Sequence, residues 1–210
     1  MVQKGQFLER PTLVPVGNEV MDATAHRGTR APPLLVLPPR PEEGGGMDHL
    51  LAAELVWAAA HAGFPTLRFN HRGVGASQGE RGTGESLVDD AEAAMRVLLE
   101  NAGTTALAVA SLYGGARVAL DLQARHPCVG GVCLVAPLDV DVVALSRLPC
   151  PLLVIVGEED RRMSRAALAS AVAESGGLLE VIEDAGPTFH RNLPQVGRAV
   201  SGWLGRLAGG

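Results

Sequence analysis

Short apolar runs rich in β-branched residues alternate along the chain with longer stretches rich in alanine and leucine. Turn-forming residues bound the short runs, as they bound buried strands, and the longer stretches have the period of helices. This alternation predicts the α/β class, with a parallel sheet whose strands are joined by crossover helices. The expected strands cover residues 12–16, 19–23, 34–37, 66–70, 106–110, 131–135, 152–156 and 179–182.

The first two strands are expected to form a hairpin. Gly17 and Asn18 separate them, and a two-residue turn of this composition joins antiparallel strands. The predicted sheet is therefore mostly parallel, with an antiparallel hairpin at its N-terminal end.

The longer stretches predict five helices. We expect them over residues 48–62, from Ser86, from about Tyr113, from about Met163 and at the C-terminus up to Gly209. Asp89 stands three residues after Ser86, which resembles a capping box and would fix the start of the second helix.

Length and composition fit one globular domain over residues 1–210. Of the 210 residues, 47% are hydrophobic and 20% are charged, which leaves enough apolar side chain for one core. A net charge of −5 gives no excess of cations to neutralise phosphates, and aromatic residues at 3% leave few rings to stack on bases. We therefore expect no nucleic-acid partner.

The chain has no expected membrane or export segment. No stretch reaches the roughly 20 apolar residues that a membrane span needs, and the N-terminus has no continuous apolar run behind its basic residue. Cys128, Cys133 and Cys150 stand in apolar surroundings without CxxC spacing, which indicates free thiols. These features favour a cytoplasmic location and no membrane partner.

Four segments follow expected strands and carry the residues with possible chemistry. In an open parallel sheet the crevice lies beyond the carboxyl ends of the strands. The segments are PPRPEEGGGMD after Leu37, FNHRGVGASQGE at Phe69, ASLYGGA at Ala110 and VGEED at Val156.

These four segments, in this order and spacing, resemble the α/β-hydrolase superfamily, and within it the small, lidless bacterial type related to dienelactone hydrolase and prolyl oligopeptidase. The resemblance covers roughly residues 34–207, and TLRFNHRGVGASQGE is its most specific part. It implies a mostly parallel sheet with helices on both faces, no cap domain, and acyl transfer by a Ser-His-Asp triad.

Residues 75–79 satisfy the G-x-S-x-G pattern, yet they do not predict a nucleophile at Ser77. A nucleophile elbow needs a strand directly before the serine and a helix directly after it. Here a loop precedes Ser77 and the next helix begins well downstream.

The expected elbow is ASLYGGA, because it follows one strand and opens a helix. Laid on this elbow of the family, the nucleophile position holds Tyr113. A phenol carries its oxygen several ångströms further out than a serine, which argues against ordinary acyl transfer. Ser111 stands two places earlier, where the elbow needs a small residue, and we interpret it as a spacer.

The acid position is kept and the base position is altered. Asp160 matches the aspartate that orients the histidine in the family, although a carboxylate there would also suit a helix N-terminus. Pro187 or Thr188 stands where the catalytic histidine belongs. His190 matches a second, non-catalytic histidine, but a small shift of its loop would bring it toward Asp160.

The oxyanion side is also altered, since Pro-Pro-Arg-Pro replaces the His-Pro-His-Pro of the family. The resemblance places the backbone N–H groups of Gly114 and Arg40 where they would bind an oxyanion or another anion. The alternative for Arg40 is a solvated loop arginine.

Three coordinated departures favour a descendant that has lost hydrolysis and serves as a binding or partner protein. One alternative is an esterase, thioesterase or peptidase with a rearranged site using His190 and Asp160. Another is a lyase or isomerase in which Tyr113 is the acid or base. No cofactor motif and no metal-ligand spacing is present, and the sequence names no particular ligand or protein partner while allowing a homo-oligomer.

Overall fold

The computed structural model describes residues 9–209, and its eight strands form one sheet in the order β1-β2-β4-β3-β5-β6-β7-β8. The strands are β1 (Arg10–Val16), β2 (Glu19–His26), β3 (Leu34–Leu37), β4 (Thr66–Phe69), β5 (Leu107–Leu112), β6 (Val129–Val135), β7 (Leu152–Gly157) and β8 (Leu178–Ile182). Pairing is antiparallel between β1 and β2 and between β2 and β4. All the other neighbouring strands of the sheet pair in parallel. The expected sheet with its N-terminal hairpin is confirmed.

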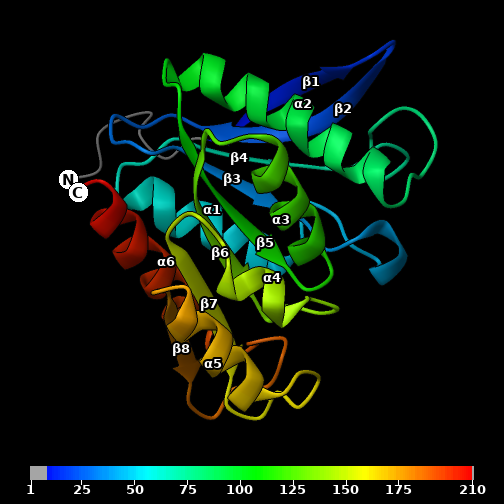
Figure 1. The fold of residues 1–210 in the computed structure, drawn as a ribbon. Helices are drawn as coiled ribbons and strands as arrows, with labels where there is room; N and C mark the ends of the chain where they lie inside the picture. The colour runs from blue at the N-terminus through cyan, green and yellow to red at the C-terminus, as the bar shows by residue number, and fades with distance from the viewer. Residues whose placement is uncertain (1–8, 210) are drawn as a thin grey trace.

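Helices cover both faces of the sheet (Figure 1). They are η1 (Pro41–Glu43), α1 (Leu50–His61), α2 (Glu85–Ala102), α3 (Gly115–Arg125), α4 (Val142–Ser146), α5 (Arg165–Glu174) and α6 (Leu193–Leu207). Alternate residues of a strand point to opposite faces. Leu34 and Val36 accordingly pack with α1 and α6, whereas Leu35 and Leu37 pack with α2, α3 and α5.

The helix boundaries correct one prediction from the sequence. The capping box at Ser86 is wrong, because α2 begins one residue earlier, after Gly84, and Ser86 Oγ donates to Thr83 O at 3.0 Å. Neither η1 nor α4 is predicted from the sequence, since each is too short to show helical periodicity.

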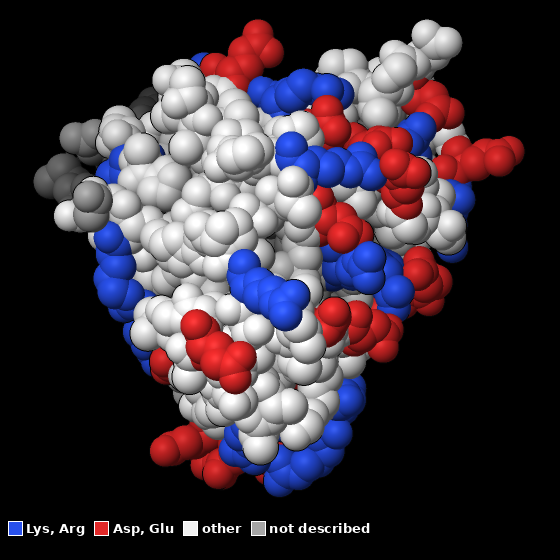
Figure 2. Space-filling view, viewed as in Figure 1, with Lys and Arg blue, Asp and Glu red and all other residues white. Residues whose placement is uncertain are grey.

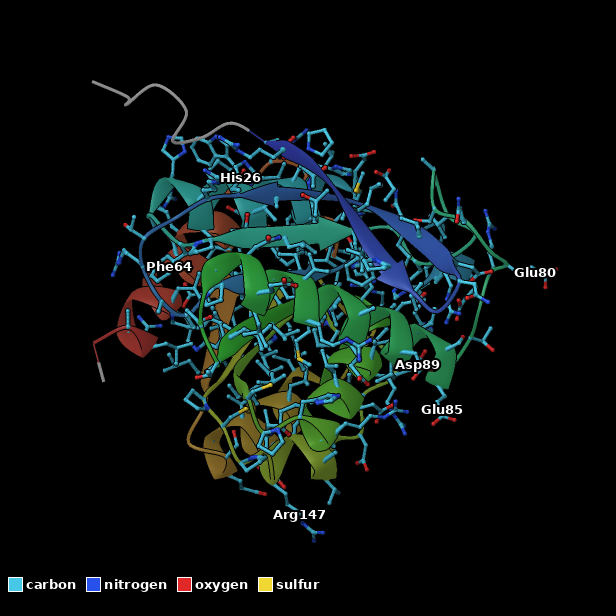
Figure 3. The ribbon with its side chains drawn as sticks, turned by 90° about the horizontal axis from the view of Figure 1, so that it is seen from above. His26, Phe64, Glu80, Glu85, Asp89 and Arg147 are labelled. Carbon is cyan, nitrogen blue, oxygen red and sulfur yellow. The ribbon has the colours of Figure 1, made fainter. Side chains whose placement is uncertain are left out.

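The loops that follow the parallel strands meet at one edge of the sheet, because these strands all point the same way. Figure 3 shows His26 and Phe64 at the end where β4 begins, and Glu80 and Glu85 at the opposite end. This second end is the carboxyl edge. The loop after β3, the turn after β5 and the loop after β7 carry Arg40, Tyr113 and Asp160 respectively.

A buried carboxylate on α2 fixes the loop after β4. Asp90 accepts hydrogen bonds from His71 Nδ1 at 3.2 Å, from the Arg72 backbone N–H at 3.1 Å and from Arg72 Nε at 2.5 Å. Asp90 and His71 are both buried. The most specific part of the family resemblance is thus a structural loop clamped to α2.

Asp90→Ala should lower the free energy of unfolding by about 3 kcal/mol, because it leaves the buried His71 and the Arg72 guanidinium without their carboxylate. Denaturant unfolding followed by circular dichroism measures the change. The neighbouring Asp89 is the matched control, since its exposed pair with Arg125 should contribute less than about 1 kcal/mol. Equal losses in the two variants would contradict the structural role of Asp90.

On the face drawn in Figure 2, acidic and basic side chains are interspersed toward the right-hand side, and the left centre is largely uncharged. Within residues 9–209, no helix is both long and apolar enough to cross a membrane, and no three His, Cys, Asp or Glu side chains cluster as metal ligands. The three cysteines are free, with Cys133 buried and Cys128 and Cys150 half-buried.

Candidate functional site

Tyr113 lies in a sharp turn between β5 and α3, with a left-handed backbone at φ 51°. This conformation costs a bulky residue roughly 1–2 kcal/mol and persists only where neighbours hold it. Here the Tyr113 N–H donates to Val135 O at 3.1 Å, and the Tyr113 carbonyl accepts from the Leu138 N–H at 3.1 Å. A strained turn that joins a strand directly to a helix is the geometry of a nucleophile elbow.

The Tyr113 side chain is only 8% exposed, and its hydroxyl is buried without a hydrogen-bond partner in the described part of the chain. The ring of His49 meets the phenol ring edge-on, with 5.4 Å between centroids. The Arg162 guanidinium lies over the Tyr113 ring, 5.2 Å from the ring centroid. The phenol ring therefore contacts both an imidazole and a cation.

Arg162 binds the carboxylate that the sequence identifies as the triad acid. Its Nη2 donates to Asp160 Oδ2 at 2.7 Å, while its Nε and its backbone N–H each donate to Oδ1 at 3.0 Å. The Asp160 side chain is 8% exposed and that of Arg162 is 33% exposed. Burial alone would raise the pKa of Asp160, but the hydrogen bonds and charge of Arg162 outweigh it and lower that pKa.

Arg162 is the site residue that sequence reasoning misses. The one signal for Arg162 in the sequence is its position two residues after Asp160, where a short turn lets a basic side chain reach the carboxylate. The guanidinium contacts both Asp160 and the Tyr113 ring, so it lies between the acid position and the nucleophile position.

The charges around the Tyr113 phenol have opposing effects on its pKa. Burial raises the pKa of the Tyr113 hydroxyl, and the carboxylates of Asp160 and Glu43 add to this, whereas the positive charge of Arg162 works against it. The net result is a raised pKa. At neutral pH this hydroxyl is a protonated hydrogen-bond donor, not a phenolate.

The loop after β8 does not join a histidine to Asp160. Pro187 is half-buried and Thr188 is exposed, and the buried Phe189 turns the backbone at φ 52°. His190 follows as an exposed residue whose side chain makes no hydrogen bond or ion pair within residues 9–209. Burial lowers the pKa of His49, and the charge of His190 lowers it further.

The two backbone donors expected on the oxyanion side converge on one atom. The Arg40 N–H and the Gly114 N–H donate to the same oxygen, Glu43 Oε2, at 3.1 and 3.2 Å. The second oxygen of this carboxylate accepts from the Arg40 guanidinium, at 3.0 Å from Nη2 and 3.3 Å from Nε. Arg40 is therefore paired inside the protein instead of being solvated.

Ser77 and Ser111, the two serines considered in the sequence analysis, take no part in this arrangement. Ser77 Oγ donates to Asn70 O at 2.8 Å and accepts from the Asp22 N–H at 2.9 Å, so it ties the loop after β4 to β2. Ser111 lies within β5, where its hydroxyl is buried and has no hydrogen-bond partner among residues 9–209.

Comparison with known proteins agrees with this geometry. Residues 43–142 match the family described as serine aminopeptidase, S33. Agrobacterium tumefaciens ATU1826, a proposed α/β hydrolase, superposes with a TM-score of 0.82 at 25% identity, over 96% of this chain and 97% of that one. The chain has the α/β-hydrolase fold.

Two further proteins are similar to this chain. XC6422 from Xanthomonas campestris, described as an α/β serine hydrolase without lid, superposes with a TM-score of 0.80 at 24% identity over 96% of each chain. The Rickettsia prowazekii protein RP471 is 30% identical over 140 residues, which are 64% of this chain and 59% of RP471. The chain thus spans less than two thirds of the length of that curated relative.

With this fold, the chain has a strained turn between a strand and a helix at Tyr113. Arg162 binds Asp160, and the Glu43 carboxylate accepts from the backbone N–H groups of Arg40 and Gly114. The two donors that the family resemblance assigns to the oxyanion side are thereby satisfied within the protein.

Tyr113→Phe should leave the free energy of unfolding unchanged or raise it by about 1 kcal/mol, because the deleted hydroxyl is buried without a partner. Denaturant unfolding measures the difference. A loss of more than about 1 kcal/mol would mean that the hydroxyl makes a stabilising hydrogen bond in solution, which is contrary to the structure.

The titration of Tyr113 can be followed without interference, since it is the one tyrosine of the 210-residue chain. Its pKa should rise in Arg162→Gln and fall in Glu43→Gln, because the first change removes a cation and the second an anion. Ultraviolet absorbance of the tyrosinate band, over the pH range in which circular dichroism shows folded protein, measures both shifts. A shift of the same sign in the two variants would contradict the proposed charge balance.

Proposed function

We propose that this α/β-hydrolase-fold protein does not hydrolyse its ligand and acts as a binding or partner protein at the carboxyl edge of its sheet. One observation carries the proposal: both oxygens of Asp160 are bound by Arg162, which also packs against the Tyr113 ring. The His49 ring meets the Tyr113 ring edge-on, but no base among residues 9–209 is hydrogen-bonded to the Tyr113 hydroxyl.

Acyl transfer needs a group that removes the proton of the nucleophile. A guanidinium has no acceptor site and stays protonated at any pH that the protein tolerates, so Arg162 cannot take the place of an imidazole. The Tyr113 hydroxyl has a raised pKa, which makes its nucleophilic form scarcer. The lack of an acceptor on Arg162 and the raised pKa of Tyr113 both disfavour acyl transfer.

A hydrolase that uses His190 with Asp160 is less well supported. It would require Arg162 to release the carboxylate, and it would leave the charge of Asp160 without its three hydrogen bonds. The His190 side chain is exposed and makes no hydrogen bond or ion pair within residues 9–209.

A lyase or isomerase that uses Tyr113 is the second candidate, and one observation favours it. The hydroxyl is a buried, protonated donor without a partner, close to the cation of Arg162. A group of this kind can donate a hydrogen bond or a proton to a substrate oxygen. Its raised pKa favours the acid role over the base role.

We also propose a cytoplasmic location. The three free thiols support it, since a reducing compartment keeps cysteines of this kind unpaired.

The first test is activity. The protein should not react covalently with a fluorophosphonate probe, and it should turn over p-nitrophenyl butyrate no faster than Tyr113→Phe does. Intact-mass spectrometry and absorbance measure the two outcomes. Saturable turnover that disappears in Asp160→Asn and in His190→Ala would overturn the proposal in favour of the rearranged hydrolase.

Restoring single family residues should not restore catalysis. Tyr113→Ser alone, and Tyr113→Ser with Pro187→His, should stay inactive toward p-nitrophenyl butyrate, because Arg162 continues to bind Asp160. Adding Arg162→Ala frees the acid, so any gain in activity should appear only in the triple variant.

Thr188→His in place of Pro187→His covers the other register of this loop. Arg161→Ala is the control for Arg162→Ala, since Arg161 donates to Glu158 O and not to Asp160. Vigorous esterase activity of Tyr113→Ser alone would show that a competent base is already present, and the proposal would then be wrong.

A further inference from the structure

The carboxylate of Glu43 is held like a bound ligand. Two backbone N–H groups from separate parts of the chain, at Arg40 and Gly114, converge on its Oε2, and the Arg40 guanidinium binds its Oε1. These four donors form a receptor for one carboxylate group, with both oxygens satisfied. Charge-assisted bonds of this kind are stronger than those between neutral groups.

The receptor is built from the fold and not from a chance surface pair. Gly114 stands 71 positions from Glu43 and directly follows the elbow at Tyr113. A Cβ at Gly114 would overlap the side chains of both Arg40 and Glu43, so the glycine leaves the space that the carboxylate fills. The N–H of Gly114 also belongs to the start of α3, an 11-residue helix whose positive end favours an anion.

A buried polar group without a partner lies beside this receptor. The Tyr113 hydroxyl has no hydrogen-bond partner among residues 9–209, and the Tyr113 side chain is more than nine-tenths buried. Tyr113 directly precedes Gly114, whose N–H binds the Glu43 carboxylate, so the phenol belongs to the same turn as the receptor. The site therefore offers an unused donor beside an anion position that is already filled.

Displacement of Glu43 would break its cap on η1 and its bonds to Arg40 and Gly114. Its side chain is 19% exposed, so the carboxylate lies near the surface, where water can receive it. Arg40 would then keep two acidic partners, Asp139 at 3.2 Å and Glu42 at 3.4 Å. The vacated position would offer the two backbone N–H groups and the Arg40 guanidinium to the acceptor atoms of an incoming group.

We propose that this position is a binding site for the carboxylate of a small organic acid, and that Glu43 is an internal occupant which such a ligand displaces. The inference rests on the proposed function, because a working hydrolase would use the same donors for a transient oxyanion. The incoming carboxylate reproduces the charge and geometry of the side chain that it replaces. The tether of Glu43 gives it a high effective concentration, so external carboxylates compete poorly while it is present.

The test titrates sodium acetate into the protein and follows the amide signals of Arg40 and Gly114 by nitrogen–proton correlation NMR. In Glu43→Ala, both signals should shift saturably, with an affinity at least roughly tenfold higher than in the unmodified protein. Glu42→Ala should behave like the unmodified protein, because Glu42 pairs with Arg40 but does not accept from either backbone N–H. Methyl acetate, which carries no charge, should cause no shift.

Glu43→Gln is a second variant of nearly the same size, which guards against misfolding of Glu43→Ala. It should also bind acetate more tightly than the unmodified protein. Gly114 signals that do not respond to acetate in both folded variants would overturn the inference. Equal shifts with chloride or inorganic phosphate would show a general anion site and would overturn the carboxylate assignment.

The two proposals fail in different ways. Ester turnover by the unmodified protein would overturn the proposed function, whatever the acetate titration shows. Inert Gly114 and Arg40 amides in the Glu43 variants would overturn the carboxylate site, whatever the activity assays show.

Discussion

The left-handed turn at Tyr113 is the constraint on which the arrangement of the carboxyl edge depends. Hydrogen bonds to Val135 and from Leu138 hold this strained backbone between β5 and α3. The turn aims the phenol at Arg162 and brings the next N–H, that of Gly114, toward the loop after β3. A bulky residue at positive φ persists only because its surroundings over-determine it, so the elbow survives without its usual serine.

Two arginine–carboxylate pairs lie near this turn. Arg162 neutralises Asp160, and Arg40 binds Glu43. Without a partner, Asp160 would be an unpaired charge in a mostly buried position, which is costly. Pairing Asp160 with a permanent cation removes that cost, and it also removes the possibility of proton transfer through this acid.

The short apolar runs of β3 and β7 predict strands that are buried along their whole length, and the structure has both. The positions of Tyr113, Gly114 and Arg40 in their loops could be predicted from the family resemblance. The roles of Arg162 and Glu43 could not. Both depend on which side chains face one another across loops far apart in sequence, and no periodicity records that information.

The chemistry that remains at the edge follows from this charge arrangement. The Arg162 guanidinium and the His49 ring contact the Tyr113 phenol, and the backbone N–H groups of Arg40 and Gly114 converge on Glu43. The carboxylates of Asp160 and Glu43 are already satisfied by Arg162 and Arg40. The edge therefore presents donors to an anion, while no base among residues 9–209 is hydrogen-bonded to the Tyr113 hydroxyl, and this asymmetry favours recognition of an anion over cleavage of an ester.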